Sequence, residues 1–389
     1  MTLRDDSTRP LVVRMGALGD MVMLTPLLKA LYERTGLAAD LVACGEWNRK
    51  LFANSPWVNE IYTVQSRNTP LLFSPSKQAM LKALKPYAAN RRWFFFEHLP
   101  ILESLMLRAN CSKSLAVLSA HHPRKLGEHT CEQLMRMADA VYEPELAQTE
   151  ASIPAVIATQ LHCSAEDIRE CEMWLAETKK IDRRAQKVVL LQAGNKRTMR
   201  KGNRDRASNI KYWPEQHWAS LIDRILAAEP DTRILLCGAP AEVDLCADIA
   251  AHCQPSSRQQ LVQCAADLPL TRLMALASIA DACISVDTGP AHIAAALGCP
   301  LVVLFGQSDA RQYRPLGVSE VRVIANKDWQ SFYESSAQWA AQNAMSDISV
   351  EQVFQGYQQL QTRNLMAHAS VTIKCQKDTV RHMGFALAS

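Results

Sequence analysis

Short apolar runs alternate with segments of helical period along most of this chain. The alternation is typical of parallel sheets covered by helices, because two parallel strands must be joined by a crossover long enough to hold a helix. A chain of 389 residues can bury two such cores, so we predict an α/β protein with two doubly wound sheets. The predicted strands are 11–14, 41–44, 61–64, 93–96 and 115–118 in the first sheet, and 188–191, 233–236, 282–286 and 301–305 in the second.

A lapse in these patterns marks the connection between the two halves. Residues 142–155 hold two prolines and several small polar side chains, which predicts an irregular segment. We therefore place the first domain at 1–160 and the second at 161–345. The remaining residues, 346–389, open with a Ser-x-x-Gln capping pair. We expect the helix that follows to pack back towards the first domain, with a tail behind it.

The composition excludes several classes of protein. Apolar residues make up 48% of the chain and charged residues 21%, which is ordinary for a globular protein and unlike a disordered or fibrous one. The formal charge of +4 is too small to indicate a dedicated nucleic-acid-binding protein. We therefore expect no nucleic-acid partner.

Neither a secretory signal nor a membrane span is expected. The first nine residues include two aspartates and lack an apolar core. The richest apolar stretch, 291–306, is shorter than the roughly 20 residues that cross a bilayer. None of the 12 cysteines forms a C-x-x-C pair, so we expect reduced, buried thiols, no metal site and a cytoplasmic protein.

The first candidate site follows the first predicted strand. Gly16, Gly19 and Asp20 lie where that strand gives way to a helix, and glycines there let a ligand or another backbone approach closely. The spacing is neither the dinucleotide-binding G-x-G-x-x-G nor a P-loop. A carboxylate at a helix start can accept a proton from a substrate hydroxyl. Taken alone, however, Asp20 is more simply explained as a helix-capping residue.

The second candidate site lies between strand 282–286 and an alanine-rich helix. Thr288 and Gly289 offer a hydroxyl and backbone N–H groups at the positive end of that helix, which suits a phosphate or diphosphate. Asp287 precedes them, and His292 could hydrogen-bond the same anion. The alternative is a well-capped structural helix with a packed histidine.

Two further residues of the second half suit a nucleotide. Lys211 stands just before a helix that starts at a proline, and it could reach a diphosphate as a point charge. Glu242 follows strand 233–236, and acidic residues at strand ends often accept hydrogen bonds from ribose hydroxyls. Each is a weak signal alone, since exposed lysines and first-turn glutamates are common.

Taken together, these motifs resemble glycosyltransferase family 9, the ADP-heptose:lipopolysaccharide heptosyltransferases. The resemblance covers roughly residues 10–320, strongly in the second half and thinly between about 50 and 145. It rests on pieces that keep one order along the chain: Gly16-x-x-Gly19-Asp20 with Thr25-Pro26, Lys211-x-Trp213-Pro214-x-x-His217-Trp218, Gly238-Ala239-Pro240-x-Glu242, Asp287-Thr288-Gly289-x-x-His292, and Phe305-Gly306-Gln307-Ser308-Asp309 running to Pro315-x-Gly317.

The resemblance implies a GT-B fold, with two Rossmann-like domains facing a central cleft, the first for the acceptor and the second for the nucleotide-sugar donor. It implies transfer of a heptose from ADP-heptose to a saccharide hydroxyl of the lipopolysaccharide core, with inversion and without a metal or other cofactor. Asp20 matches the catalytic base, Glu242 the residue near the ribose, and Gly16 and Gly19 the phosphate or acceptor loop. The remaining donor-site matches are Lys211, Asp287, Thr288, Gly289 and His292.

One segment departs from the family pattern. The basic run 195–206 lies where the family has a shorter loop. A solvated surface loop is the simpler interpretation, and a site for the phosphates or carboxylates of an anionic acceptor is the other. Positive loops would also favour peripheral contact with the cytoplasmic face of the inner membrane. We therefore expect a nucleotide-sugar donor and an anionic saccharide or glycolipid acceptor as partners.

The sequence leaves three alternatives open. A related transferase of the same fold would share the motif around Asp287 but use another nucleotide sugar or a protein acceptor. An epimerase of this fold would turn over the donor without any acceptor. A non-catalytic homologue would bind the nucleotide sugar and show no turnover.

Overall fold

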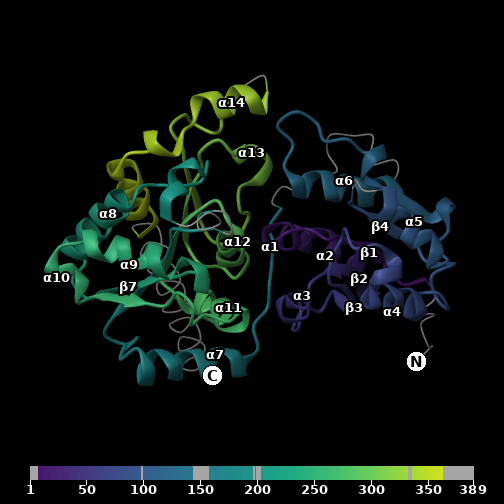
Figure 1. Ribbon diagram of the computed structural model, residues 1–389, viewed down its shortest axis with the longest axis horizontal. Coiled ribbons are helices and arrows are strands. Elements are labelled where there is room, and N and C mark those ends of the chain that lie inside the picture. Colours follow the sequence, from purple (N-terminus) through teal and green to yellow (C-terminus); the bar gives the residue numbers. More distant parts are fainter. Residues whose placement is uncertain are drawn as a thin grey trace, which may run out of the picture.

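Two parallel sheets organise the part of the chain that the computed structural model describes, one in each half (Figure 1). This confirms the predicted α/β class. The first sheet has the order β3-β2-β1-β4-β5 and the second β11-β10-β9-β6-β7-β8, so both are doubly wound. The described residues are 8–97, 100–142, 157–195, 198, 203–331 and 335–361.

The strands of the first sheet are short and mostly buried. Side chains alternate between the two faces of a strand, so Val12 and Phe94 join the buried cluster on one face while Leu11 and Trp93 join the cluster on the other. The strands are β1 Leu11–Val13, β2 Ala39–Cys44, β3 Val58–Val64, β4 Trp93–Phe95 and β5 Ala116–Leu118.

Helices cover both faces of the first sheet. Leu28 and Met137 join Val12 on one face, whereas Met80 and Leu105 lie on the other. The elements that carry them, with their neighbours, are α1 Leu18–Val22, α2 Thr25–Thr35, α3 Trp47–Leu51, the 3₁₀ turn η2 Leu71–Phe73, α4 Pro75–Leu84, α5 Pro100–Arg108, the 3₁₀ turns Lys113–Leu115 and Ser119–His121, and α6 Thr130–Tyr142.

The second sheet repeats this plan with longer central strands. Val189 of β6 packs with Trp218 on one face, and Leu190 packs with Ala275 on the other. Because both faces are covered, the central strands β6, β9 and β10 are mostly apolar and buried. They are β6 Lys187–Gln192, β7 Thr232–Leu236, β8 Leu261–Gln263, β9 Ala282–Val286, β10 Leu301–Leu304 and β11 Val321–Ile324.

The helices of the second half flank this sheet on either side. Ile222 and Leu245 join the cluster of Val189, and Ile293 joins that of Leu190. The elements are α7 Ala165–Met173, continued by a π-helical turn Trp174–Thr178, the 3₁₀ segment Asn203–Ser208, α8 Glu215–Ala228, the 3₁₀ turn Pro240–Glu242, α9 Val243–His252, α10 Pro255–Arg258, α11 Leu270–Ile279, α12 Gly289–Ala296, α13 Ala310–Tyr313, α14 Ser336–Gln342 and the 3₁₀ turn Met345–Asp347.

The two halves meet at α1 and α12, which contact each other in the middle of the molecule (Figure 1). Met21 of α1 and Ile293 of α12 belong to one buried cluster. A second contact joins the segment before α6 to α13. There the buried His129 donates from Nε2 to the carbonyl oxygen of Arg314 over 2.9 Å, and Thr130 Oγ1 donates to the carbonyl of Gln312 over 3.0 Å.

The helix near the C-terminus corrects one expectation. Residues 350–361 are helical, and the predicted capping pair is present, since Gln352 N donates to Ser349 Oγ over 3.2 Å. However, Val353 and Tyr357 pack in the cluster of the second sheet, and the helix does not turn back to the first domain as we expected. Gly356 of this helix lies against β11, because a Cβ added there would lie 2.9 Å from the Cδ1 atom of Ile324. The predicted tail, 362–389, lies outside the described residues.

Local signals account for most element boundaries. Pro26 stands in the first turn of α2 and separates it from α1, because proline suits the start of a helix and not its interior. Ser164 and Asp167 form the predicted capping box of α7. The edge strands β8 and β11 escaped prediction because they are short and only half-buried, which leaves a weak apolar pattern. The predicted connection, 142–155, lies almost wholly outside the described residues.

Candidate functional site

The candidate residues follow strands at the carboxyl ends of the two sheets. Asp20 comes after β1, which lies between β2 and β4 where the first sheet reverses its strand order. Asp287 comes after β9, which adjoins β6 at the corresponding point of the second sheet. In open α/β sheets ligands bind at the carboxyl ends of strands at such switch points. The topology therefore brings both candidate motifs to ligand-binding positions.

The Asp20 carboxylate is held by two donors. Arg14 Nη2 donates to Oδ1 over 2.9 Å, and the backbone N–H of Ala17 donates to Oδ2 over 2.8 Å. The second bond is a capping interaction at the start of α1, which confirms that Asp20 caps a helix. The side chain remains 30% exposed, and a carboxylate has about four acceptor positions. Capping therefore leaves room for a substrate hydroxyl.

Gly16 and Gly19 are required by packing. A Cβ atom at Gly16 would lie 2.5 Å from Asp20 Cβ, and one at Gly19 would lie 2.8 Å from the Cδ2 atom of His292. Gly19 thus lets a residue of the first half lie directly against a residue of the second. Gly289 does the same from the other side, where an added Cβ would lie 2.8 Å from Leu18 Cβ.

The start of α12 has the features of an anion site. Thr288 precedes the helix in an extended conformation, Gly289 begins it, and Pro290 occupies its first turn. His292 is 3% exposed, and its Nδ1 has no hydrogen-bond partner among the described residues. Burial lowers the pKa of His292, a shift that the carboxylates of Asp287 and Asp20 oppose. A neutral imidazole with an unused nitrogen therefore lies at the positive end of a helix.

Lys211 and Asp287 are brought together across 76 residues of sequence. The Lys211 Nζ atom donates to Asp287 Oδ2 over 2.5 Å and to the carbonyl oxygen of the same residue over 3.0 Å. The lysine is 29% exposed and the aspartate 7%. A positive charge is therefore fixed beside the start of α12, where the sequence predicts a diphosphate.

Glu242 lies in the 3₁₀ turn Pro240–Glu242 that follows β7, close to Gly194 and Gly238. Its Oε2 accepts a hydrogen bond from Ala239 N over 2.7 Å, whereas Oε1 has no partner among the described residues. A Cβ at Gly194 would lie 2.1 Å from that Oε1. Burial raises the pKa of Glu242, although bonds from Ala239 and Gln192 oppose the shift. An unused buried carboxylate oxygen is the kind of acceptor that a ribose hydroxyl would satisfy.

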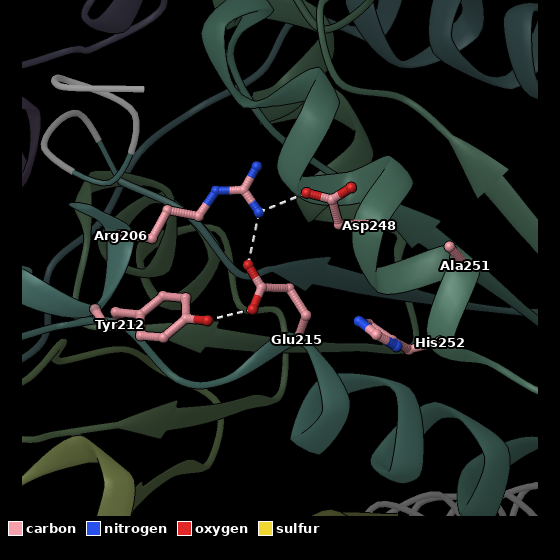
Figure 2. Close-up of a pocket in the computed structure, with 7 residues that line it drawn as sticks. Arg206, Tyr212, Glu215, Asp248, Ala251 and His252 are labelled. Carbon is pink, nitrogen blue, oxygen red and sulfur yellow. Dashed lines mark hydrogen bonds and ion pairs between the residues drawn. The ribbon is translucent and has the colours of Figure 1, made fainter. Parts of the chain in front are cut away.

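The last residue of the basic run 195–206 is not solvated, while the expectation of a solvated loop for the rest of the run stays a prediction. Arg206 is buried, and its Nη1 donates to Glu215 Oε1 over 2.6 Å and to Asp248 Oδ2 over 2.7 Å (Figure 2). Tyr212 also donates to Glu215. Burial would raise the pKa of Glu215, but these bonds outweigh it and lower the pKa. Residues 196, 197 and 199–202 lie outside the described part of the chain.

A cavity of about 530 Å³ adjoins this ion-pair cluster (Figure 2). None of the predicted site residues lines it. Its walls come from α8, α9 and the segment before α8, and the lining residues are Arg206, Ala207, Tyr212, Glu215, Asp248, Ala251 and His252. The cluster adjoins the segment that leads to Lys211. Of the predicted donor residues, Lys211, Asp287, Thr288, Gly289 and His292 are grouped at the start of α12, whereas Glu242 lies beside Gly194 and Gly238.

Two residues near Asp20 escaped prediction. Arg14, which binds the Asp20 carboxylate, also donates from Nη1 to the carbonyl oxygen of Phe96 over 2.8 Å. Glu97 follows β4, is buried, and accepts a hydrogen bond from Met15 N over 2.7 Å. The sequence gives one indication of a role for Arg14 and Glu97, namely that each follows the carboxyl end of a strand. That the two residues lie close together depends on β1 and β4 being neighbours in the sheet, which the sequence does not show.

The described residues hold no group of three or more His, Cys, Asp or Glu side chains arranged to bind a metal ion. The expectation that the reaction needs no metal stays a prediction. Every cysteine in the described ranges is free, and most are buried, as expected. No helix among those ranges is long and apolar enough to cross a membrane.

Comparison with known proteins gives matches over part of the chain. Residues 170–338 match the model of glycosyltransferase family 9 (heptosyltransferase). Lipopolysaccharide heptosyltransferase 1 of Pseudomonas aeruginosa is 34% identical over 116 residues, which cover 29% of this chain and 30% of that protein. Lipopolysaccharide heptosyltransferase 3 of Escherichia coli is 35% identical over 108 residues, covering 27% and 30%. The chain thus spans under a third of the length of these curated relatives.

Solved structures match over nearly the whole chain and show the fold. ADP-heptose lipopolysaccharide heptosyltransferase II of E. coli is 18% identical, with a TM-score of 0.69 over 92% of this chain and 99% of that one. A family 9 glycosyltransferase of Veillonella parvula is 15% identical, with a TM-score of 0.74 over 93% and 100%. The shared fold confirms the predicted GT-B architecture. Residues 170–338 of the second half are similar in sequence to glycosyltransferase family 9, and over the rest of the chain the likeness is one of fold.

Proposed function

We propose that this protein is an inverting glycosyltransferase that moves a heptose from ADP-heptose to a saccharide hydroxyl of the lipopolysaccharide core. One observation supports it most. Gly19, the neighbour of Asp20, lies against His292 of α12. A partly exposed carboxylate of the first half and an anion-binding helix start of the second half therefore border the same point. The match of residues 170–338 to the family model and the partial likeness to curated heptosyltransferases support the choice of sugar.

The donor would lie along the carboxyl edge of the second sheet. The N–H groups at Gly289 and the hydroxyl of Thr288 suit its diphosphate, and Lys211 supplies a positive charge there. Glu242 offers its unused Oε1 to a ribose hydroxyl. Because Asp287 already binds the lysine ammonium, the diphosphate would share that charge with a carboxylate. The leaving nucleotide would thus meet a site that is positive but partly neutralised.

The chemical step needs one base and a stabilised leaving group. As the acceptor oxygen bonds to the anomeric carbon, its proton passes to the Asp20 carboxylate. The bond from that carbon to the diphosphate oxygen breaks, and its electron pair leaves with the nucleotide. The start of α12 and Lys211 stabilise the charge that develops there. Attack from the face opposite the leaving group inverts the anomeric centre.

The test is transfer from ADP-heptose to defined core acceptors by wild type and by Asp20→Asn. A general base contributes roughly 10²–10⁴-fold, so we expect a loss of about 10³-fold in kcat with unchanged ADP affinity. Asp167→Asn is the matched control, because Asp167 caps α7 as Asp20 caps α1 and lies far from the donor residues in sequence. Normal transfer by Asp20→Asn would refute the assignment of the base.

The same assay separates the alternatives. Mass spectrometry of products from a panel of nucleotide sugars would identify a different donor. Donor turnover in the absence of any acceptor would indicate an epimerase. ADP binding without turnover on any acceptor, lipid-linked or protein, would indicate a binding protein.

A further inference from the structure

A cavity of about 230 Å³, separate from the one in Figure 2, lies beside the last strand of the second sheet. Its walls come from the end of β11, the loop 325–329 that follows it, and the helix 350–361. The predicted donor residues are not among those that line it. Cavities of about 300–1,000 Å³ hold drug-sized ligands, so this one suits a smaller molecule, of the size of a single sugar ring.

Three glutamines of the helix form one wall of this cavity. Gln352, Gln355 and Gln359 are three and four residues apart, so they share one face of the helix. Gln359 Oε1 accepts a hydrogen bond from Arg322 Nη1 over 2.6 Å, and Gln355 Nε2 donates to Glu351 Oε1 over 2.7 Å. Each of these two amides is therefore held at one end. The other ends, Gln359 Nε2 and Gln355 Oε1, are left as a donor and an acceptor that the described residues do not use.

The rest of the lining is largely apolar. Ile324 and Ala325 lie at the end of β11, and Gly356 contributes a stretch of bare helix backbone between the glutamines. Trp329 adds a half-buried indole ring, and the guanidinium of Arg314 lies 4.5 Å from the centroid of that ring. This cation–π contact holds the ring in one orientation. An aromatic ring beside amide groups offers both an apolar surface and hydrogen bonds to one ligand.

The lining residues carry no net charge. Lys327 and Asp328 are the charged members, one of each sign, and the glutamines are neutral. A phosphate or a carboxylate would require a cationic site, and an ammonium group an acidic one. A neutral molecule with several hydroxyl groups fits better, because each hydroxyl can both donate to an amide oxygen and accept from an amide nitrogen.

The cavity lies on the same edge of the sheet as the donor residues. Ile324 of β11 is in register with Leu304 of β10, and Leu304 is in register with Val286 of β9, the residue before Asp287. Neighbouring strands are about 4.8 Å apart, so the end of β11 lies about 10 Å from the end of β9. Ligands of open α/β sheets bind along this carboxyl edge. The cavity therefore has a position that suits a second ligand.

We propose that this cavity binds one neutral sugar ring, at a site separate from the donor site. The C–H groups of the ring pack on Trp329 and on the apolar end of β11, and its hydroxyls bind Gln355 Oε1 and Gln359 Nε2. The volume favours a sugar over a peptide, since an extended peptide needs a groove several residues long. The inference does not rest on the proposed function, because it uses none of the donor residues.

The experiment is saturation-transfer NMR of the full-length protein with methyl glycosides of glucose, galactose and a heptose, and with glucuronic acid and glucosamine as charged probes. We expect a neutral glycoside to bind with a Kd of about 1 mM, as befits a ligand of so few atoms, and saturating ADP to leave it bound. Trp329→Ala should weaken binding by about tenfold, and Gln355→Ala with Gln359→Ala by about fivefold for each glutamine. Gln358→Ala is the matched control, because Gln358 is exposed on the same helix and does not line the cavity.

Several results would overturn the proposal. Wild type would bind no neutral glycoside at about 10 mM, ten times the expected Kd, or ADP would displace the glycoside, which would assign it to the donor site. Equal binding by wild type and the glutamine double variant, or preferred binding of a charged probe, would also refute it. Thermal unfolding of each variant shows whether a loss of binding is a loss of fold. ADP affinity, measured on the same samples, tests the proposed function independently.

Discussion

The two halves of the molecule share one topology and differ in how they hold their candidate residues. In the second half Asp287, His292 and Glu242 are all less than a tenth exposed, and each is fixed by packing or by a hydrogen bond. In the first half Asp20 is 30% exposed and is held by Arg14 and by the backbone of Ala17. A site built for one small anionic ligand can be fixed in advance, whereas a site for a large acceptor must stay open.

The largest expected effect on stability concerns the second half, where the candidate residues are buried. Lys211→Met leaves the Asp287 carboxylate buried without its ammonium partner, so we expect unfolding free energy to fall by about 3 kcal/mol. ADP affinity should fall by about tenfold or more, because the diphosphate loses a charge. Urea unfolding and calorimetric titration measure the two effects.

A matched variant shows whether the buried environment is responsible. Lys187 pairs with Glu229 over 3.0 Å, but these side chains are 44% and 23% exposed. Lys187→Met should therefore cost under about 1 kcal/mol and leave ADP binding unchanged. Equal losses of stability in both variants would show that burial of the Lys211–Asp287 pair is not the cause of the larger effect.

The next effect concerns the contact between the halves. Burial lowers the pKa of His129 to about 3, from an ordinary value of 6.5. The unfolded chain therefore binds the proton first, and stability is lost as the pH falls below about 6.5. Wild type should lose about 2 kcal/mol more than His129→Gln between pH 6.5 and pH 5. Urea unfolding of both proteins across that range measures this, and parallel curves would show that His129 is not buried as a neutral group.

The smallest expected effect concerns the first half, where Asp20 is partly exposed. Arg14→Gln removes one donor that orients Asp20, so we expect kcat to fall by about tenfold while the KM for the donor stays constant. Arg14→Lys should restore part of kcat. Stability should change by under about 1 kcal/mol because the pair is partly exposed.

Arg49→Gln is the control for this last prediction. Arg49 pairs with Glu46 and Glu60 on the exposed surface of the same half. If that variant lowers kcat as much as Arg14→Gln does, then the orientation of Asp20 is not the cause. A rise in the KM for the donor with Arg14→Gln would instead assign Arg14 to donor binding, which would contradict the assignment of the donor site to the second half alone.

Much of the fold could be predicted because its signals are local. Buried parallel strands such as 282–286 are apolar on both faces, so they stand out as continuous runs. Helix starts at Ser164 and Pro26 follow from single residues. The edge strand β11 was missed because its half-buried residues give no comparable run. The helix near the C-terminus was predicted, but the sheet against which it packs was not, because an apolar helix face does not identify the sheet that it will cover.

By itself the sequence determined the α/β class, the order of the strands and helices along the chain, and the motifs that carry the family resemblance, because each depends on neighbours within a few residues. Only the tertiary structure decided that Lys211 binds Asp287, that Arg206 is buried between two acids, and that Gly19 lies against a histidine of the other half. Those contacts join residues far apart in the chain. They are set by how strands order themselves in a sheet and how two sheets meet, which no local pattern contains.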